Sequence, residues 1–197
     1  MAPPRKHDTD RILDAARAIV LDRGPRAASV TAIARASGAP AGTLYHRFGS
    51  RDQILSAAWL RALERFQERC LAAAAHDDPT EAGVAMAASI VAFARADFDD
   101  ARLLLSLRAG DLLDASPNAV LRARLDTMNA PLLAEIRRVA RAIHGRADRR
   151  ALDAVTRAVV DLPYASVRRH VRAKRIPQWL ERDVAEASRT LLRTTLT

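Results

Sequence analysis

The sequence predicts an all-α protein, with a three-helix helix-turn-helix head at the N-terminus followed by a C-terminal helical bundle. Two observations carry this prediction. Alanine, leucine and arginine are abundant, and aromatic residues make up only 4% of the chain, a composition that favours helix over strand. No stretch alternates polar and apolar residues over a useful length, as a half-buried strand would. Apolar residues make up 49% of the 197 residues, so the chain has enough of them to build a core.

The first third of the chain predicts four helices, separated by clear break signals. Gly24-Pro25 ends the first helix, because Gly takes a left-handed cap and Pro cannot continue the hydrogen bonds. Ser29 and Ser50 are natural N-caps for helices that follow them. The expected helices cover approximately residues 8–22, 30–36, 41–48 and 51–74.

The rest of the chain predicts a series of further helices, without an internal repeat. The expected helices cover approximately residues 79–98, 101–113, 116–143, 148–174 and 177–196. Pro131 and Pro163 lie inside helical patterns, so each predicts a kink or a division of its helix. Asp97, Asp99 and Asp100 form an acidic cluster, which we expect to be a solvated helix end.

Positive charge is concentrated at the N-terminal end of the chain. Residues 1–51 hold nine Lys and Arg against four Asp, whereas the remaining residues hold 23 against 19. An electropositive N-terminal segment suits a polyanion such as DNA, although solvated arginines would give the same count. We therefore divide the chain into a DNA-binding domain over residues 1–50 and a dimerisation and ligand-sensing domain over residues 51–197.

Several classes of protein find no support in the sequence. A single cysteine, Cys70, gives neither a disulfide framework nor a zinc site. The histidines show no metal-binding spacing, and no phosphate loop, nucleophile elbow or paired-carboxylate pattern is present. The N-terminus lacks the apolar core of a signal peptide, and no apolar run is long enough to span a membrane. We expect a cytoplasmic protein that is not an enzyme and has no cofactor, no metal and no membrane contact.

The segment GTLYHRFG, which begins at Gly42, carries the functional argument. Two short helices joined by a Gly-containing turn, after a longer first helix, predict a helix-turn-helix whose second helix lies in the DNA major groove. Gly42 and Thr43 allow a close approach to DNA. Leu44 and Phe48 lie four residues apart and face the core. Tyr45 and its two successors then face the duplex and can reach phosphates and base edges.

The segment SVTAIARASGAPAGTLYHRFGSRDQIL closely resembles the N-terminal signature of the tetracycline-repressor-like (TetR-like) transcription regulators. The resemblance depends on the Ile33-Ala34 pair, Gly38, the run from Gly42 to Tyr45, Phe48, and a basic residue followed by an acidic one at 51–52. It covers only the first third of the chain. The family's usual Lys at the start of the long helix is Arg51 here, which keeps the charge but not the geometry.

This resemblance implies a DNA-binding repressor that works as a homodimer on an inverted-repeat operator in double-stranded DNA. An unidentified small-molecule effector in the C-terminal domain would release the DNA. The residues implied for backbone phosphates are Tyr45, Arg47 and Arg51. Those implied for base edges are His46, Thr43, Thr31 and Ala41.

Apolar residues in the last two predicted helices recur with the three- and four-residue steps of a helical bundle seam. An intramolecular core would show the same steps. Helix-turn-helix readers need two half-sites about 34–36 Å apart, which favours a two-fold interface. The residues predicted for this interface are Leu152, Val155, Val159, Leu162, Leu180, Val184, Ala187 and Leu191.

A ligand pocket is predicted from apolar and mixed helix faces in the middle of the chain. The candidate residues are Trp59, Phe66, Met86, Phe93, Leu105, Arg108, Met128 and Tyr164, and each of them also fits an ordinary core position. Arg108 and Tyr164 are the candidate polar anchors. Mainly aliphatic walls favour an apolar or weakly acidic ligand over a polycation.

The sequence therefore predicts a sequence-specific DNA-binding transcriptional regulator, acting as a repressor. Two alternatives stay open. In one, a regulator of the same kind has lost small-molecule sensing. In the other, a helical enzyme or small-molecule-binding protein carries a basic head that does not bind DNA.

Overall fold

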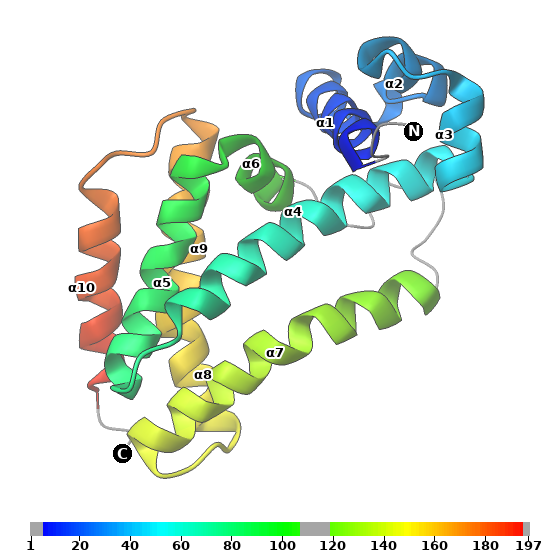
Figure 1. The fold of residues 1–197 in the computed structure, drawn as a ribbon. Coiled ribbons are helices and arrows are strands. Elements are labelled where there is room, and N and C mark those ends of the chain that lie inside the picture. Colours follow the sequence, from blue (N-terminus) through cyan, green and yellow to red (C-terminus); the bar gives the residue numbers. More distant parts are fainter. Residues whose placement is uncertain (1–5, 107–118, 195–197) are drawn as a thin grey trace. The chain divides into compact units, whose positions relative to one another are not determined.

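The computed structural model describes residues 6–106 and 119–194, and every regular element in these two ranges is a helix (Figure 1). The predicted all-α fold class is confirmed. The chain forms two compact units. The head unit comprises Met1–Leu63 and Asp99–Ala119, and the body unit comprises Glu64–Phe98 and Val120–Thr197.

The helices of the head unit follow the predicted order closely. The elements are α1 (Lys6–Arg23), the short 3-10 helix η1 (Pro25–Ala27), α2 (Val30–Ser37), α3 (Ala41–Phe48), the first part of α4 (Arg51–Ala73) and nearly all of α6 (Phe98–Ser106). Gly24 and Gly38 have φ values of 82° and 72°, so both breaks use the left-handed backbone that favours glycine.

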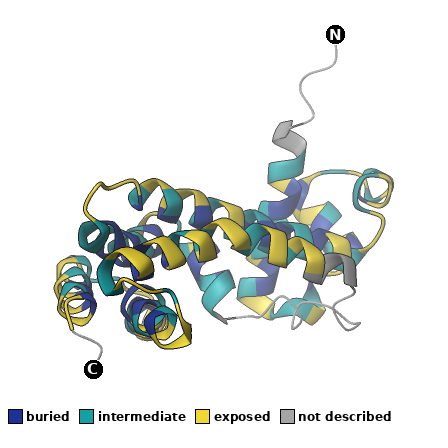
Figure 2. Cartoon of the chain, turned by 90° about the horizontal axis from the view of Figure 1, so that it is seen from below, coloured by how far each residue is buried: buried dark blue, intermediate teal, exposed yellow. Residues whose placement is uncertain are grey.

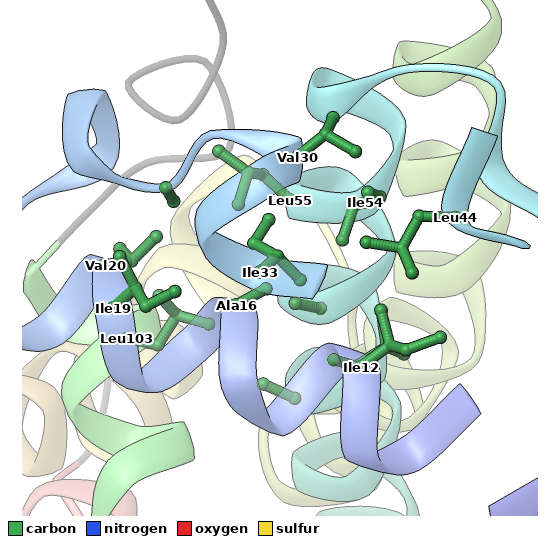
Figure 3. Close-up of a cluster of buried hydrophobic side chains, with 14 residues drawn as sticks. Ile12, Ala16, Ile19, Val20, Val30, Ile33, Leu44, Ile54, Leu55 and Leu103 are labelled. Atoms are coloured by element: carbon green, nitrogen blue, oxygen red, sulfur yellow. The ribbon is translucent and has the colours of Figure 1, made fainter. Parts of the chain in front are cut away.

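The core of the head unit is formed by aliphatic side chains from all of its long helices (Figure 3). Ile12 of α1, Ile33 of α2 and Leu44 of α3 are completely buried there. Leu103 of α6 joins the same core. The head unit is thus larger than the predicted three-helix head, because a helix some fifty residues later in the chain completes its core. The functional boundary after residue 50 stays a prediction.

The body unit is a bundle with its own core, and its buried residues line the inner faces of its helices (Figure 2). Its elements are the second part of α4, α5 (Pro79–Ala96), α7 (Ala119–His144), α8 (Arg149–Thr156), the π-helical segment η3 (Arg157–Asp161), α9 (Leu162–Arg172) and α10 (Leu180–Leu192). Gly83 allows α5 and α10 to approach closely. A Cβ at this position would lie 2.8 Å from Cδ1 of Leu192.

The two internal prolines behave differently from one another. Pro131 lies inside α7 without dividing it, since a proline removes a single intrahelical hydrogen bond and the helix is anchored by buried Ile136 and Val139. Pro163 lies in the first turn of α9, directly after the π-helical segment, and the predicted helix over 148–174 continues from Arg149 to Arg172 with this segment inside it. The expected start at Ser116-Pro117 lies outside the described residues.

The π-helical segment explains a buried hydroxyl. The N–H of Leu162 donates to the carbonyl of Arg157, five residues back. Pro163 has no N–H with which to make the next bond of this series. Ser188 of α10, which is fully buried, donates its hydroxyl to the carbonyl of Ala158 over 2.8 Å. A side chain from a distant helix therefore replaces the donor that the proline lacks.

Candidate nucleic-acid interface

The turn between α2 and α3 is built by local capping. The hydroxyl of Ser29 accepts a hydrogen bond from the N–H of Ala32 over 3.1 Å, as predicted for an N-cap. Gly38 ends α2 in the left-handed conformation, and Pro40 precedes α3. The carbonyl of Pro40 accepts hydrogen bonds from the N–H groups of the first turn of α3. The turn thus sets the direction in which α3 begins.

Adjacent residues of α3 face opposite ways. Leu44 is completely buried in the head core (Figure 3). Tyr45, the next residue, is 57% exposed. His46 is exposed, and Phe48 is partly buried against the core. This division between an apolar inner face and an aromatic and imidazole outer face is the one that the sequence predicted.

The eight residues predicted for DNA contact all lie in the head unit. Four of them are exposed, namely Thr31, Gly42, Tyr45 and His46. Ala41, Thr43, Arg47 and Arg51 are partly buried. Nη1 of Arg47 donates to Oγ1 of Thr9 in α1 over 2.8 Å, so this guanidinium has a partner within the head. The role of each residue toward DNA stays a prediction.

Arg51 is held inside the head unit. Its Nη2 donates to the carbonyl of Pro25 over 2.6 Å, its Nε to the carbonyl of Ala28 over 3.2 Å, and its Nη1 to Asp52 over 2.7 Å. Its side chain is only 16% exposed. The guanidinium therefore ties the start of α4 to the η1 segment, a structural role that the predicted phosphate contact did not anticipate.

Two further arginines brace the head unit. Arg17 of α1 forms an ion pair with Asp100 of α6, whose side chain is 1% exposed. Arg61 of α4 pairs with Asp10 of α1 over 2.9 Å and also with Asp14. The expectation of a solvated acidic cluster was wrong for Asp100, because α6 packs into the head. Sequence reasoning missed this pair, since its partners lie 83 residues apart.

Sequence similarity to known proteins is found in the same N-terminal region that contains α2 and α3. Residues 12–58 match the family model described as bacterial regulatory proteins of the tetR family. The match lies wholly within the head unit. The HTH-type transcriptional regulator UidR of Escherichia coli K12 is 44% identical over 62 residues, which cover 29% of this chain and 32% of UidR. The match thus spans about a third of that relative's length.

Solved structures extend the likeness of fold beyond the matched segment. A TetR family transcriptional regulator from Thermus thermophilus, PfmR, superposes with a TM-score of 0.71 at 23% identity, covering 100% of this chain and 99% of PfmR. FadR from Bacillus subtilis, in complex with stearoyl-CoA, gives 0.69 at 16% identity, covering 95% and 99%. A tetR family transcription regulator from Shewanella sp. PV-4 gives 0.72 at 20%, covering 94% and 95%. Likeness at these identities shows the fold.

The residues predicted to line a ligand pocket are distributed over both units. Trp59 and Leu105 belong to the head unit. In the body unit, Met86 and Phe93 are buried, and the Phe93 ring meets that of Phe66 edge to face at 5.5 Å. Met128 is partly buried, Tyr164 is 41% exposed, and Arg108 lies outside the described residues. The arrangement of Met86 and Phe93 is that of core residues.

Two hollows on the described part of the body unit are lined by residues other than those predicted for the pocket. One, of about 540 Å³, is lined by Pro79, Thr80, Ala142, Ile143, His144, Arg146, Leu192, Arg193 and Thr194. The other, of about 460 Å³, is lined by Ala134, Arg137, Arg138, Arg141 and Ala142. A ligand site formed by the predicted residues stays a prediction.

The residues predicted for the dimer interface fall into two groups. Val155, Val159, Leu180 and Val184 are buried within the body unit, so they pack in its core. Leu152 and Leu162 are partly buried, and Ala187 and Leu191 are exposed. The first group, which recurs every three or four residues, therefore packs in the core of the body unit itself. Only the second group retains surface for a second copy of the chain.

Three features of the part of the chain that the structure describes concern a metal site, a reactive thiol and a membrane span. The described residues contain no group of three or more His, Cys, Asp or Glu side chains that could hold a metal ion. Cys70 is buried, and burial raises the pKa of its thiol, which disfavours the reactive thiolate. No described helix is long and apolar enough to cross a membrane.

Proposed function

We propose that this protein is a sequence-specific DNA-binding transcriptional regulator, most simply a repressor, that reads DNA with α3. The observation that carries the proposal is the outer face of α3. It presents Tyr45 and His46 to solvent while Leu44 anchors the helix in the head unit, which contains the segment that matches the tetR family. Phosphate contacts by arginine contribute less to this proposal than the sequence suggested, because Arg47 and Arg51 donate hydrogen bonds to groups inside the head.

The proposed contacts divide into two kinds. Tyr45 contacts a backbone phosphate, which fixes the position of the head on the duplex without reading sequence. His46, Thr43 and Thr31 contact base edges in the major groove, where each base pair shows a distinct pattern of donors and acceptors. Gly42 and Ala41 keep the start of α3 small enough for a close approach.

Selection from random duplex DNA at fixed salt tests this proposal. We expect an enriched inverted repeat whose half-sites lie about 34–36 Å apart or a multiple of that distance, because a two-fold dimer presents two copies of α3. Tyr45→Ala should weaken binding to the selected site about 10- to 100-fold, the equivalent of about 1–3 kcal/mol for a lost contact. Tyr45→Phe, the matched control, separates loss of the hydroxyl from loss of the ring.

The result opposed to the proposal is equally concrete. If no sequence is enriched and Tyr45→Ala leaves binding unchanged, the chain is a helical enzyme or binding protein whose basic head is incidental. Thermal melting of each variant checks that the head is folded. Tyr45 is exposed, so its replacement should change stability little.

We also propose that the body unit mediates dimerisation and senses an apolar or weakly acidic effector. The exposed Ala187 and Leu191 of α10 support the first part, and the FadR structure with stearoyl-CoA supports the second by analogy of fold. Light scattering on the full chain should give the mass of a dimer. Thermal-shift measurements with fatty acids, acyl-CoA esters and polycations test the effector class, and stabilisation by polycations alone would contradict it.

A further inference from the structure

The end of α9 and the connection that follows it form a strongly positive surface that the proposed reading head does not use. Five cationic side chains lie there, all of them exposed: Arg168, Arg169, Arg172, Lys174 and Arg175. We call this group the basic cap. No Asp or Glu occurs anywhere in residues 162–180. In the part of the chain that the structure describes, no carboxylate forms an ion pair with any of the five.

The backbone that carries the basic cap is well defined. Lys174 has a positive φ of 54°, which turns the chain at the end of α9. The N–H of Arg175 donates to the carbonyl of His170 over 3.1 Å, which closes that turn. Arg95 of α5 then donates to the carbonyl of Pro177 over 3.2 Å and pairs with Glu181 over 2.7 Å. The connection between α9 and α10 is thus tied to the body unit (Figure 1).

An aromatic side chain lies next to the basic cap. Trp179 is 50% exposed, and its ring meets that of His170 edge to face at 5.7 Å. Burial, and then the neighbouring Arg169, lowers the pKa of His170, which favours the neutral imidazole. The surface therefore combines guanidinium groups, which bind phosphate bidentately, with an exposed indole beside them.

Helix capping explains only part of this arrangement. Cations in the last turn of a helix are stabilised by its negative end, which accounts for Arg169 and Arg172. It does not account for Lys174 and Arg175, which lie beyond the helix, nor for the exposed Trp179. A cluster of unpaired like charges is unfavourable unless a polyanion neutralises it.

A membrane surface fits the basic cap poorly. A helix that lies on a membrane needs an apolar face opposite its cationic face. In α9 that face consists of Val167 and Val171, and both are buried in the body unit. Apart from Tyr164, which is 41% exposed, the outer face of α9 then offers little apolar surface for insertion. Duplex DNA requires no apolar face, since its phosphates are bound at the surface.

We propose that the basic cap is a second DNA-binding surface of this protein, which contacts backbone phosphates of duplex DNA independently of sequence. The proposal rests on the proposed function only in taking DNA as the polyanion that the chain meets. Because phosphate contacts carry no sequence information, the basic cap strengthens binding to every duplex and leaves the choice of site to α3.

The salt dependence of binding to a labelled random-sequence duplex tests this proposal. Each phosphate neutralised contributes about 0.9 to the slope of log K against log salt concentration. The variant Arg168→Gln/Arg172→Gln/Lys174→Gln/Arg175→Gln should reduce the slope by about 2 or more and weaken binding at least about tenfold at low salt. Replacing the three arginines by Lys instead should keep most of the slope, because the charge is preserved.

A matched control removes the same amount of charge from another part of the body unit. Arg137, Arg141, Arg149 and Arg150 are exposed residues of α7 and α8, and their replacement by Gln should leave the slope unchanged. An equal effect of both variants would show that only net charge matters and would overturn the proposal. So would an unchanged slope in a basic-cap variant whose melting temperature matches that of the unmodified protein.

Two further measurements distinguish this proposal from a membrane-binding site and from the proposed function of α3. If the basic-cap variant loses binding to vesicles of anionic phospholipid but not to DNA, the surface is a membrane site and the proposal fails. Tyr45→Ala/His46→Ala should abolish selection of a sequence while keeping salt-dependent binding to random duplexes. If selection finds no preferred sequence but binding to random duplexes depends on the basic cap, the proposed sequence-specific function is wrong and the proposal of a second DNA-binding surface is supported.

Discussion

The head unit and the body unit differ in whether they bury an ion pair. In the head, Arg17 pairs with the buried Asp100, and Arg61 pairs with Asp10 and Asp14, so guanidinium groups join helices to one another. In the described part of the body, the buried polar side chains are neutral, namely Gln67 and Ser188, while the basic cap stays at the surface.

This difference shows that net charge in a sequence does not measure the charge available at a surface. The N-terminal quarter carries the larger excess of positive charge, yet several of its arginines are neutralised or hydrogen-bonded internally. The outer face of α3 is consequently aromatic and imidazole rather than strongly cationic. Residues 52–197 have the smaller excess of positive charge, and the body unit nevertheless presents five cations without an ion pair within eight residues at the end of α9.

The buried ion pair of the head gives the largest expected effect. Asp100→Asn removes the buried carboxylate that pairs with Arg17 and leaves the more exposed Asp14, at 3.3 Å, in its place, which should lower the free energy of unfolding by about 3 kcal/mol. Asp99→Asn is the matched control, since Asp99 is the exposed neighbour in the same helical turn, and it should change stability by less than about 0.5 kcal/mol. Urea unfolding measures both, and equal effects would contradict the assignment of Asp100 to the head core.

Arg51 tests whether an arginine of the head is structural or reserved for DNA. Arg51→Ala removes a charged donor from two backbone carbonyls, of Pro25 and Ala28, and should cost about 2 kcal/mol of unfolding free energy. Arg51→Lys should recover only part of this loss, because one ammonium cannot replace the guanidinium fork. The salt slope of DNA binding should not change with Arg51→Lys. A stability left intact by Arg51→Ala, together with a shallower slope for that variant, would restore the phosphate-clamp interpretation.

The neutral hydrogen bond of the body should be worth less. Ser188→Ala leaves the carbonyl of Ala158 without the hydroxyl that donates to it, at a cost of about 1–2 kcal/mol. In a Pro163→Ala background the new N–H can serve that carbonyl, so the second substitution should cost less than about 0.5 kcal/mol. The double-mutant cycle thus yields a coupling energy, and strictly additive effects would show that the proline does not create the need for Ser188.

The smallest effect concerns a surface ion pair of the body. Glu81 of α5 accepts hydrogen bonds from Nε and Nη2 of Arg189 at 3.0 and 2.9 Å, and this contact lowers the pKa of Glu81. A lowered pKa contributes stability at neutral pH that is lost as the pH falls through the pKa of the folded state. Melting temperatures measured down to about pH 3 should therefore decline slightly less for Glu81→Gln. The matched control, Glu68→Gln, should follow the unmodified protein.

Local sequence signals anticipated the helices α2 and α3 of the head unit. Ser29 caps α2, Gly38 ends it, and Leu44 and Tyr45 face opposite sides of α3, as their chemistry and spacing indicated. These features depend on residues within a few positions of one another, so helical periodicity and capping rules are sufficient to find them.

Features that join distant segments were not anticipated. The placement of Leu103 in the head core, the pair formed by Arg17 and Asp100, and the hydroxyl of Ser188 on the carbonyl of Ala158 each link helices far apart in the chain. The dimer prediction shows the same limit. The steps through Val155 and Val159 are equally regular for a core and for an interface, and both residues are in fact buried within the body unit.

The sequence by itself determined the helical class, the order of the helices in the head and the faces of α3, because each follows from the local chemistry of the backbone and its side chains. Only the tertiary structure decided which charges are available to a partner. Arg51 and Arg175 carry the same charge, but one is held by carbonyls of the η1 segment and the other lies exposed beyond the end of α9. Whether a charge is paired depends on contacts between segments that are distant in the chain, and residue counts contain no information about those contacts.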